Sequence, residues 1–353
     1  MFNRLRAFAQ TTTVLGVAMI VLIWGGVAFL SGAERDHANE AGLRQGDNLT
    51  RIFEAYISQV VKGTDSALLA LRDSYERTPR DFDLMRSVDN ARFQNDLVVQ
   101  FVIIGREGIM KHSTLASSGR LVDLSDRDHF RHQADATTDE LFISPPVVGR
   151  VSGKATVQLA RKLRAPDGSF DGVILASLDI FQVEKFYNSI DVGRSGTISL
   201  VGFDGIIRAR SSRQHDAEGL TGRSMAGAKI FEAYRKSPAG SYWTSPDFAA
   251  RMDGVSRLIS YRVVEGLPLI AIVGLAKDDI FEQSSLKTNQ YRQVGFALTA
   301  FVLVVIGFGA IRQMRLASAM AALEASSRSL GQTNLRRSKT WRTRFACSTI
   351  SNA

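Results

Sequence analysis

The stretch KATVQLARKLRAPDGSFDGVILASLD, from Lys154 to Asp179, decides the fold. Two runs of alternating, often β-branched residues, 155–163 and 170–178, flank a Pro-Asp-Gly turn at 166–168. This combination predicts a β-hairpin, because the turn residues supply the backbone angles that reverse the chain between two alternating strands. A hairpin of this length needs further strands and a helical cover to be stable. We therefore expect the flanking chain to supply both.

The hairpin belongs to a supersecondary pattern that occurs twice. In the first copy it is preceded by a strand, a turn, a return, a short helix and an edge segment, at 97–104, 105–108, 109–112, 126–133 and 141–148. A helix over 181–190 is expected to close this copy. The second copy has a strand, a turn, a return, an edge strand and a hairpin, at 197–201, 203–205, 206–210, 241–244 and 255–274. Two copies of one unit predict two similar modules in tandem.

Two uncharged runs flank the modules. The run TVLGVAMIVLIWGGVAFL at 13–30 is long enough to cross a bilayer, and so is the run at 294–311. After the first run, apolar residues recur at helical spacing to about Arg77, which predicts one long amphipathic helix. Because Ser31 to Ala33 has the small residues of a cleavage site, a removed signal peptide stays an alternative to an uncleaved anchor.

The net charge of +9 lies in the outer flanks of the two apolar runs. Arg4 and Arg6 precede the first run, and eight cations against the single anion Glu324 follow the second from Arg312 onward. A basic excess in these places is typical of the cytoplasmic ends of membrane helices and not of a phosphate-binding patch. We expect both ends in the cytoplasm, the middle outside, and no nucleic-acid partner.

The predicted fold class is α+β, with two tandem modules of antiparallel sheet on a shared long N-terminal helix, flanked by two transmembrane helices. The expected segments are a cytoplasmic N-terminus at 1–12, transmembrane helices at 13–30 and 294–311, and an extracytoplasmic region at 31–293 between them. Within that region we expect a long helix at 34–78, a membrane-distal module at 79–190 and a membrane-proximal module at 191–277. A cytoplasmic signalling helix at 312–336 and an aberrant basic tail at 337–353 follow.

The C-terminal segment changes character along its length. Leu316, Met320, Leu323 and Leu330 fall near a three-four spacing that predicts a short parallel coiled coil. From Arg337 the chain is basic and has no apolar period. Plausible codons for 338–353, read one base earlier, give a sequence that resembles the start of a PAS domain. We therefore expect that a frameshift truncated a longer signalling protein, which the downstream genomic DNA can test.

Four motifs carry a resemblance to a known family. They are Asp126-Arg127-Asp128-His129-Phe130, Gly149-Arg150-Val151-Ser152-Gly153-Lys154, Asp167-Gly168-Ser169-Phe170 and Ser177-Leu178-Asp179. With the tandem modules and the long helix, they resemble a double Cache sensor domain. Such domains form the extracytoplasmic parts of bacterial chemoreceptors, sensor histidine kinases and diguanylate cyclases. The resemblance implies a ligand in the membrane-distal module, between the central hairpin and the loop that carries the short helix.

The resemblance also implies which residues bind the ligand. Amino-acid-binding members have a tyrosine, an arginine, a Trp-Tyr pair and an aspartate at the end of a strand. Arg127 matches the arginine and Asp179 the aspartate, whereas His129 and Phe130 stand in place of the Trp-Tyr pair and Val122 replaces the tyrosine. A guanidinium suits a carboxylate, and a carboxylate opposite it suits an ammonium or a hydroxyl. The ligand is therefore expected to be a carboxylate or an amino-acid-like compound.

Each of these residues has a plainer interpretation. Arg127 can form a surface ion pair with Asp126 or Asp128, and Asp179 can cap a helix that starts at Phe181. Arg150 and Lys154 belong either to the rim of the pocket or to a solvated strand edge.

The expected function is a membrane-bound small-molecule sensor in the plasma membrane, working as a homodimer without catalytic residues or a cofactor. Its histidines lack the spacing of a metal site, and Cys347 is the lone cysteine. One alternative is a truncated diguanylate cyclase, phosphodiesterase or sensor histidine kinase without its catalytic domain. A second is a periplasmic binding protein released by signal cleavage.

Overall fold

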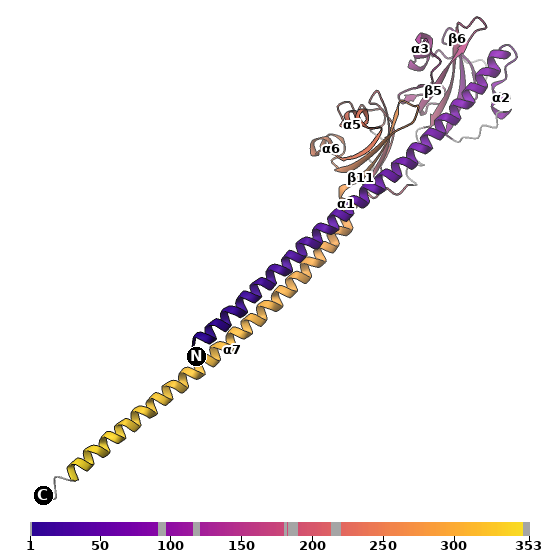
Figure 1. Ribbon diagram of the computed structural model, residues 1–353. Coiled ribbons are helices and arrows are strands. Elements are labelled where there is room, and N and C mark those ends of the chain that lie inside the picture. Colours follow the sequence, from indigo (N-terminus) through magenta and orange to yellow (C-terminus); the bar gives the residue numbers. More distant parts are fainter. Residues whose placement is uncertain are drawn as a thin grey trace. The chain divides into compact units, whose positions relative to one another are not determined.

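The computed structural model describes residues 2–90, 97–115, 121–179, 182, 190–212 and 220–348. The chain divides into two compact units (Figure 1). The helical unit comprises Met1–Asp36 and Gln283–Ala353, and the sheet unit comprises His37–Glu282. The expected helix over 181–190 lies outside the described residues, except for residues 182 and 190.

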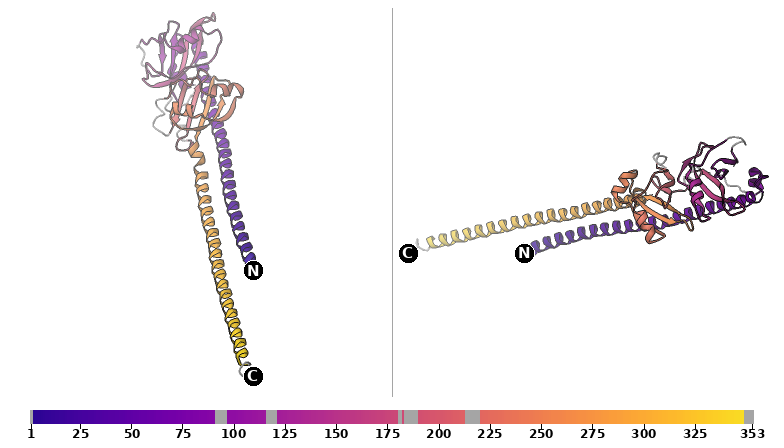
Figure 2. Two further views of the ribbon diagram at one scale, coloured as in Figure 1. Left: turned by 90° about the vertical axis from the view of Figure 1, so that its left-hand side faces the viewer. Right: turned by 90° about the horizontal axis from the view of Figure 1, so that it is seen from above.

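Two very long helices supply the helical unit. Helix α1 spans Phe2–Arg77 and helix α7 spans Lys277–Ser348, and each contains a stretch long and apolar enough to cross a membrane. Within this unit the helices lie side by side (Figure 2), and the Trp24 indole donates a hydrogen bond to Thr299 Oγ1 at 3.2 Å. Ten residues after Trp24 in α1, Glu34 accepts hydrogen bonds from Lys287 Nζ at 2.9 Å and from the Tyr291 hydroxyl at 3.2 Å.

The first module is built on a six-stranded antiparallel sheet. Its strands are β1 (Val98–Gly105), β2 (Met110–Ser113), β3 (Phe142–Ile143), β4 (Val147–Val148), β5 (Ala155–Arg164) and β6 (Phe170–Asp179). The order is β2-β1-β6-β5-β3, with β4 also paired to β5, so the predicted hairpin occupies the centre. Helix α2 (Leu84–Asn90) and helix α3 (Asp128–Asp135) complete the described part of the module.

The second module repeats this topology with five strands. They are β7 (Thr197–Gly202), β8 (Ile207–Ser212), β9 (Ala239–Trp243), β10 (Arg257–Val263) and β11 (Leu269–Ala276), in the order β8-β7-β11-β10-β9. Two short helices, α5 (Ile230–Lys236) and α6 (Pro246–Met252), were not expected from the sequence. Helix α6 has its own start signal, because the Ser245 hydroxyl accepts a hydrogen bond from the backbone N–H of Phe248 and proline follows the cap.

One apolar core joins the two sheets along α1. Strand alternation directs Ile174, Ala176 and Leu178 of β6 toward this core, where they join Phe53 and other residues of α1, while Val173 and Leu175 form a smaller cluster on the opposite face. Full burial of side chains of this size stabilises the fold by about 2 kcal/mol each. Both modules therefore pack against helix α1. The predicted α+β fold class is confirmed.

Helix α1 approaches the second sheet closely at a glycine. A Cβ atom on Gly46 would collide with the hydroxyl of Ser260 on β10. Four residues earlier, a Cβ on Gly42 would lie 3.1 Å from the Ile280 side chain. The absence of side chains at these two positions allows the helix backbone to lie directly on its neighbours.

Candidate ligand-binding site

The outer face of the first sheet, away from α1, carries a row of buried polar side chains. The row exists because Gln100, Gln158 and Ser177 occupy paired positions on adjacent strands and so point to one face. Gln100 Nε2 donates to Ser177 Oγ at 3.3 Å, Ser177 Oγ donates to Gln158 Oε1 at 2.7 Å, and Gln158 Nε2 donates to Thr156 Oγ1 at 2.8 Å. These hydrogen bonds make a polar floor beside an otherwise apolar face.

Helix α3 and the residue before it lie over this floor. Arg127 is the N-cap of α3, and its Nη2 donates to the Val148 carbonyl at 3.2 Å. His129 is only 4% exposed, and its Nε2 has no hydrogen-bond partner among the described residues. Burial, and then the positive charge of Arg127, lowers the pKa of His129 to about 4. The imidazole is therefore neutral at neutral pH, with one nitrogen available to a ligand.

An ion pair connects the loop before α3 with the loop after β4. Arg150 Nη1 and Nη2 donate to the two carboxylate oxygens of Asp126 at 2.7 and 2.6 Å, and Nη1 also donates to the Asp123 carbonyl. This bidentate contact lowers the pKa of Asp126 and raises that of Arg150. Because the pair is exposed to solvent, it contributes little to stability, and a competing carboxylate can replace Asp126.

A cavity of about 30 Å³ lies between the two loops and the sheet. Its lining includes Arg127 and Arg150 from the loops, His129 from α3, and Gln100, Gln158 and Leu175 from the sheet. A cavity of this volume holds about two water molecules. A larger ligand can enter only if the loops around Asp126 and Arg150 separate.

The other three expected residues lie elsewhere. Phe130 packs in the outer apolar cluster, edge-on to Phe170 with ring centroids 5.7 Å apart. The buried Asp179 carboxylate ends the polar face of β6 and contacts Lys154 Nζ at 3.3 Å. Of the six residues, three therefore line the cavity, two form a separate ion pair, and Phe130 positions α3 on the sheet.

The plainer interpretations of these residues agree with the observed contacts to different degrees. In the described part of the chain, Arg127 forms no ion pair with Asp126 or Asp128, because Arg150 holds Asp126 and Arg127 contacts a backbone carbonyl. The suggested capping role of Asp179 concerns a helix outside the described residues. Arg150 and Lys154 precede β5, and each contacts a carboxylate.

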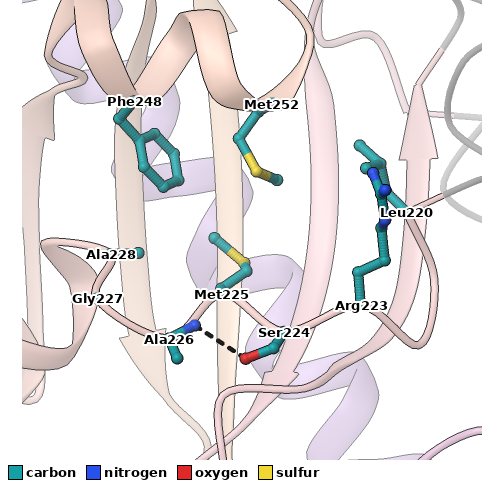
Figure 3. A pocket seen from close by; sticks show the side chains of 9 residues that line it. All are labelled: Leu220, Arg223, Ser224, Met225, Ala226, Gly227, Ala228, Phe248 and Met252. Carbon is teal, nitrogen blue, oxygen red and sulfur yellow. Dashed lines mark hydrogen bonds between the residues drawn. The ribbon is translucent and has the colours of Figure 1, made fainter.

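The second module contains a larger pocket that sequence reasoning missed. Its volume is about 370 Å³, and Leu220, Arg223, Ser224, Met225, Phe248 and Met252 contribute to its lining (Figure 3). Helix α6 supplies Phe248 and Met252. The Ser-Pro-Asp start of this helix was the available signal, since serine at the N-cap followed by proline is typical of a helix start.

Comparisons with known proteins agree with the fold. A family model described as a dCache_1-like histidine kinase sensor domain matches residues 179–274. The extracellular domain of rpHK1S-Z16, named as a histidine kinase, shares 26% identity over 67% of this chain and 95% of that chain, with a TM-score of 0.58. No curated protein sequence matches the chain significantly.

Two chemoreceptor structures are more distant. The ligand-binding domain of Campylobacter jejuni Tlp3 with 4-methylisoleucine has 13% identity, covers 69% of this chain and 94% of that chain, and has a TM-score of 0.49. The ligand-binding domain of Pseudomonas fluorescens CtaA with L-isoleucine has 18% identity, 71% and 98% coverage, and a TM-score of 0.48. The match to a dCache_1-like sensor domain and the fold shared with rpHK1S-Z16 confirm that this chain, with its two modules on α1, resembles a double Cache sensor domain.

Proposed function

We propose that the protein is a membrane-bound sensor that binds a small carboxylate or amino-acid-like compound in its first module. The observation that carries this proposal is the cavity between α3 and the sheet, where two arginines and a buried histidine lie over a polar floor. The likeness to Cache sensor domains supports a role in ligand binding.

The proposed recognition follows from the chemistry of the side chains. Arg127 and Arg150 offer guanidinium groups to a ligand carboxylate, and Arg150 exchanges Asp126 for that carboxylate. His129 offers the unpartnered Nε2. For an amino-acid-like ligand, its ammonium takes the place of Lys154 at Asp179. Phe130 positions α3.

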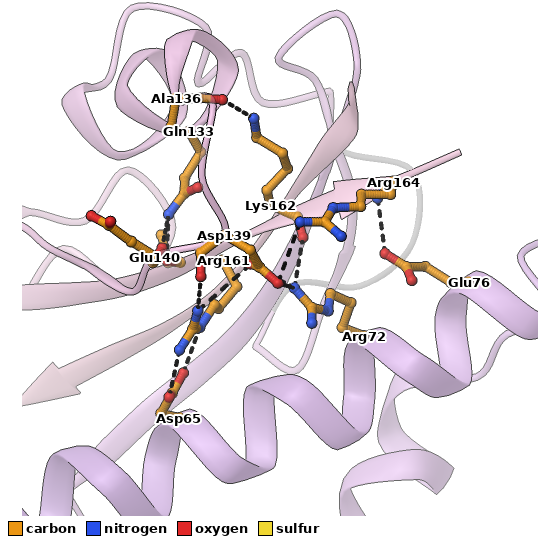
Figure 4. A network of polar contacts seen from close by, with 11 residues as sticks. Asp65, Arg72, Glu76, Gln133, Ala136, Asp139, Glu140, Arg161, Lys162 and Arg164 are labelled. Atoms are coloured by element: carbon orange, nitrogen blue, oxygen red, sulfur yellow. Dashed lines mark hydrogen bonds and ion pairs between the residues drawn. The ribbon is translucent and has the colours of Figure 1, made fainter. Parts of the chain in front are cut away.

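A network of ion pairs connects the binding module to α1 (Figure 4). Arg161 of β5 donates from Nε and Nη2 to the Asp65 carboxylate of α1, both at 2.7 Å. Asp139, in the segment after α3, accepts from Arg72 of α1 at 2.8 Å, and its backbone carbonyl accepts from Arg161 Nη1 at 2.7 Å. In this proposal, ligand binding shifts α3 and β5, and the network passes that shift to α1.

The proposed signalling route continues along α1 toward the membrane. Helix α1 runs without a break from Phe2 to Arg77, so it contains both the contacts with the sheets and the first apolar run. We place the sheet unit on the outer side of the plasma (inner) membrane and both ends of the chain in the cytoplasm. A second copy of the chain lies beside α1 in a homodimer. The alternative is the sensor part of a histidine kinase, which the likeness to the extracellular domain of rpHK1S-Z16 favours.

A ligand screen tests the proposed site. The full chain, purified in detergent, is screened by thermal shift against amino acids, small carboxylates and amines. A ligand should raise the melting temperature of the parent and of Arg131→Ala, which changes an exposed arginine of α3, but not that of Arg127→Ala. A ligand that stabilises Arg127→Ala as much as the parent would remove Arg127 from the site.

A further inference from the structure

Two buried arginines on the outer face of the second sheet share one carboxylate. Arg210 of β8 and Arg257 of β10 are 6% and 4% exposed. Arg210 Nη2 contacts one Asp253 oxygen at 3.0 Å, and Arg257 Nη1 contacts the other at 2.7 Å. Arg210 Nη1 also donates to Ser199 Oγ at 3.3 Å, and Arg257 Nε donates to the Ser195 carbonyl at 2.9 Å. Asp253 therefore stands between two guanidinium groups.

Among the described residues, the charges at this place do not balance. In the described part of the chain, Asp253 is the one carboxylate that either arginine contacts, which leaves an excess of one positive charge. Arg210 Nε and Arg257 Nη2 are buried and lack hydrogen-bond partners among the described residues. Burial, and then the charge of Arg257, lowers the pKa of Arg210. A buried charge without a partner is unfavourable, so the arrangement favours the binding of one anion.

The backbone near the arginines makes room for them. A Cβ on Gly274 of β11 would lie 2.9 Å from Arg257 Cδ and 2.7 Å from Thr197 Oγ1. The glycine thus leaves space for the arginine stem on a sheet face that is otherwise covered by side chains. Both arginines line an inner cavity of about 30 Å³, together with Thr197, Ser199 and Thr244.

Three side chains separate this inner cavity from the 370 Å³ pocket, because they line both: Met225, Phe248 and Met252. Figure 3 shows their thioethers and ring on the walls of the larger pocket. Methionine side chains adopt several conformations at low cost and adapt to a ligand. A molecule with a charged head and a short apolar body can therefore reach from the arginines into the pocket.

We propose that the second module binds a small monocarboxylate at Arg210 and Arg257, with its aliphatic end between Met225, Phe248 and Met252. A single negative charge compensates the one excess positive charge among the described residues, and the carboxylate accepts hydrogen bonds from Arg210 Nε and Arg257 Nη2, which have no partner there. This site is separate from the one proposed in the first module.

Calorimetric titration of the full chain in detergent tests the inference, with propionate and butyrate as probes and propionamide as the uncharged analogue. The variant Arg210→Gln leaves Asp253 paired one-to-one with Arg257, so we expect it to fold, and its melting temperature checks this. Because hydrogen bonds to charged groups are lost, this variant should bind propionate about tenfold more weakly than the parent. Arg194→Gln, at a 77% exposed arginine of the same module, is the matched control and should bind as the parent does.

The outcomes separate the two proposed sites. Propionate binding that is kept by Arg127→Gln and weakened by Arg210→Gln supports the second site, whatever the ligand of the first module. The inference is overturned if the parent binds neither propionate nor butyrate, if propionamide binds equally well, or if Arg210→Gln keeps the parent affinity. Binding lost only in Arg127→Gln would place the carboxylate in the first module, which supports the proposed function and overturns this inference.

Discussion

His129 is almost fully buried, yet its Nε2 has no hydrogen-bond partner among the described residues. A side chain in such a place makes the protein sensitive to acid, because the folded state resists protonation that the unfolded chain accepts. The same property keeps the imidazole neutral and available for a ligand. Stability and proposed binding therefore depend on one ring.

The first prediction concerns pH. With a folded-state pKa of about 4 against an ordinary value of 6.5, the unfolded chain binds a proton at His129 before the folded chain does. The free energy of unfolding should therefore decrease as the pH falls from about 6.5 to 4, by about 3 kcal/mol in total. In His129→Phe this contribution should be absent, so urea unfolding of parent and variant between these pH values measures it.

His132→Phe is the control for this experiment, since it changes an exposed histidine of the same helix. It should keep the acid sensitivity due to His129. Equal pH dependence of the parent and His129→Phe would contradict the prediction.

The second prediction concerns two glycines of the central hairpin with positive φ. Gly172 has a φ of 140°, and a Cβ there would collide with the Ile104 carbonyl oxygen across the β1–β6 pairing, whereas nothing lies within 4 Å of a Cβ on Gly168. Gly168→Ala should cost about 1 kcal/mol from backbone strain alone. Gly172→Ala should cost clearly more, because the two strands must separate. Thermal unfolding of both variants tests this, and equal losses would contradict it.

At the scale of elements, the α1–β5 connection combines buried charge with long-range contacts. Arg161 and Asp65 are 13% and 20% exposed, so their interaction is screened less than that of a surface pair. Asp139 brings Arg72 and Arg164 into the same network. Directional ion pairs as well as apolar contacts therefore hold the sheet on the helix.

The third prediction is a coupling energy. Removing one partner leaves a poorly solvated charge, so Arg161→Met should lower the free energy of unfolding by about 3 kcal/mol. Combining it with Asp65→Asn should recover part of the loss, with a coupling of about 1 to 3 kcal/mol in a double-mutant cycle.

The exposed pair Arg77–Asp73 at the end of the same helix is the matched control. Its coupling should stay below about 1 kcal/mol. Equal coupling in the two pairs would show that burial does not strengthen the Arg161–Asp65 interaction.

Elements with a clear hydrophobic period could be predicted from the sequence, whereas short helices and contacts between residues far apart in the sequence could not. The hairpin at 155–178 and the repeated topology followed from alternation and turn chemistry. Helices α5 and α6 have seven residues each, about two turns, which is too short to display a periodic stripe.

The candidate sites depend on contacts that local patterns do not encode. The family motif pointed to Arg127 and His129, but the partner of Arg150 is 24 residues away in sequence. Arg210 and Asp253 are 43 residues apart, and their pairing appears only once β8 and α6 have been placed on one sheet.

At the scale of the whole molecule, the two apolar runs belong to helices that continue beyond them in both directions. In the helical unit, the contacts of Trp24 with Thr299 and of Glu34 with Lys287 connect α1 and α7 at two levels. The excess of basic over acidic residues lies, in the sequence, at the ends of these runs that face away from the sheets. This distribution supports a sheet unit outside the cytoplasm.

The fourth prediction is the topology. An alkaline phosphatase fusion at Gly168 should be active, because this enzyme folds only outside the cytoplasm, and a fusion at Ala321 should be inactive. A green fluorescent protein fusion at the same two positions should give the reverse pattern. An inactive phosphatase at Gly168, with the fusion protein present at a normal level, would contradict the assignment.

Gly46 affects how displacements of the second sheet reach helix α1. Where a helix and a strand are in contact through long side chains, a small displacement of the strand is taken up by rotation of those side chains. Little of the displacement then reaches the helix backbone. At Gly46 the helix meets the Ser260 hydroxyl without any side chain of its own, so only one short side chain stands between β10 and the helix main chain. The absence of a methyl group at Gly46 thus shortens the connection, and in the proposed topology a displacement of the second sheet reaches the helix through few rotatable bonds.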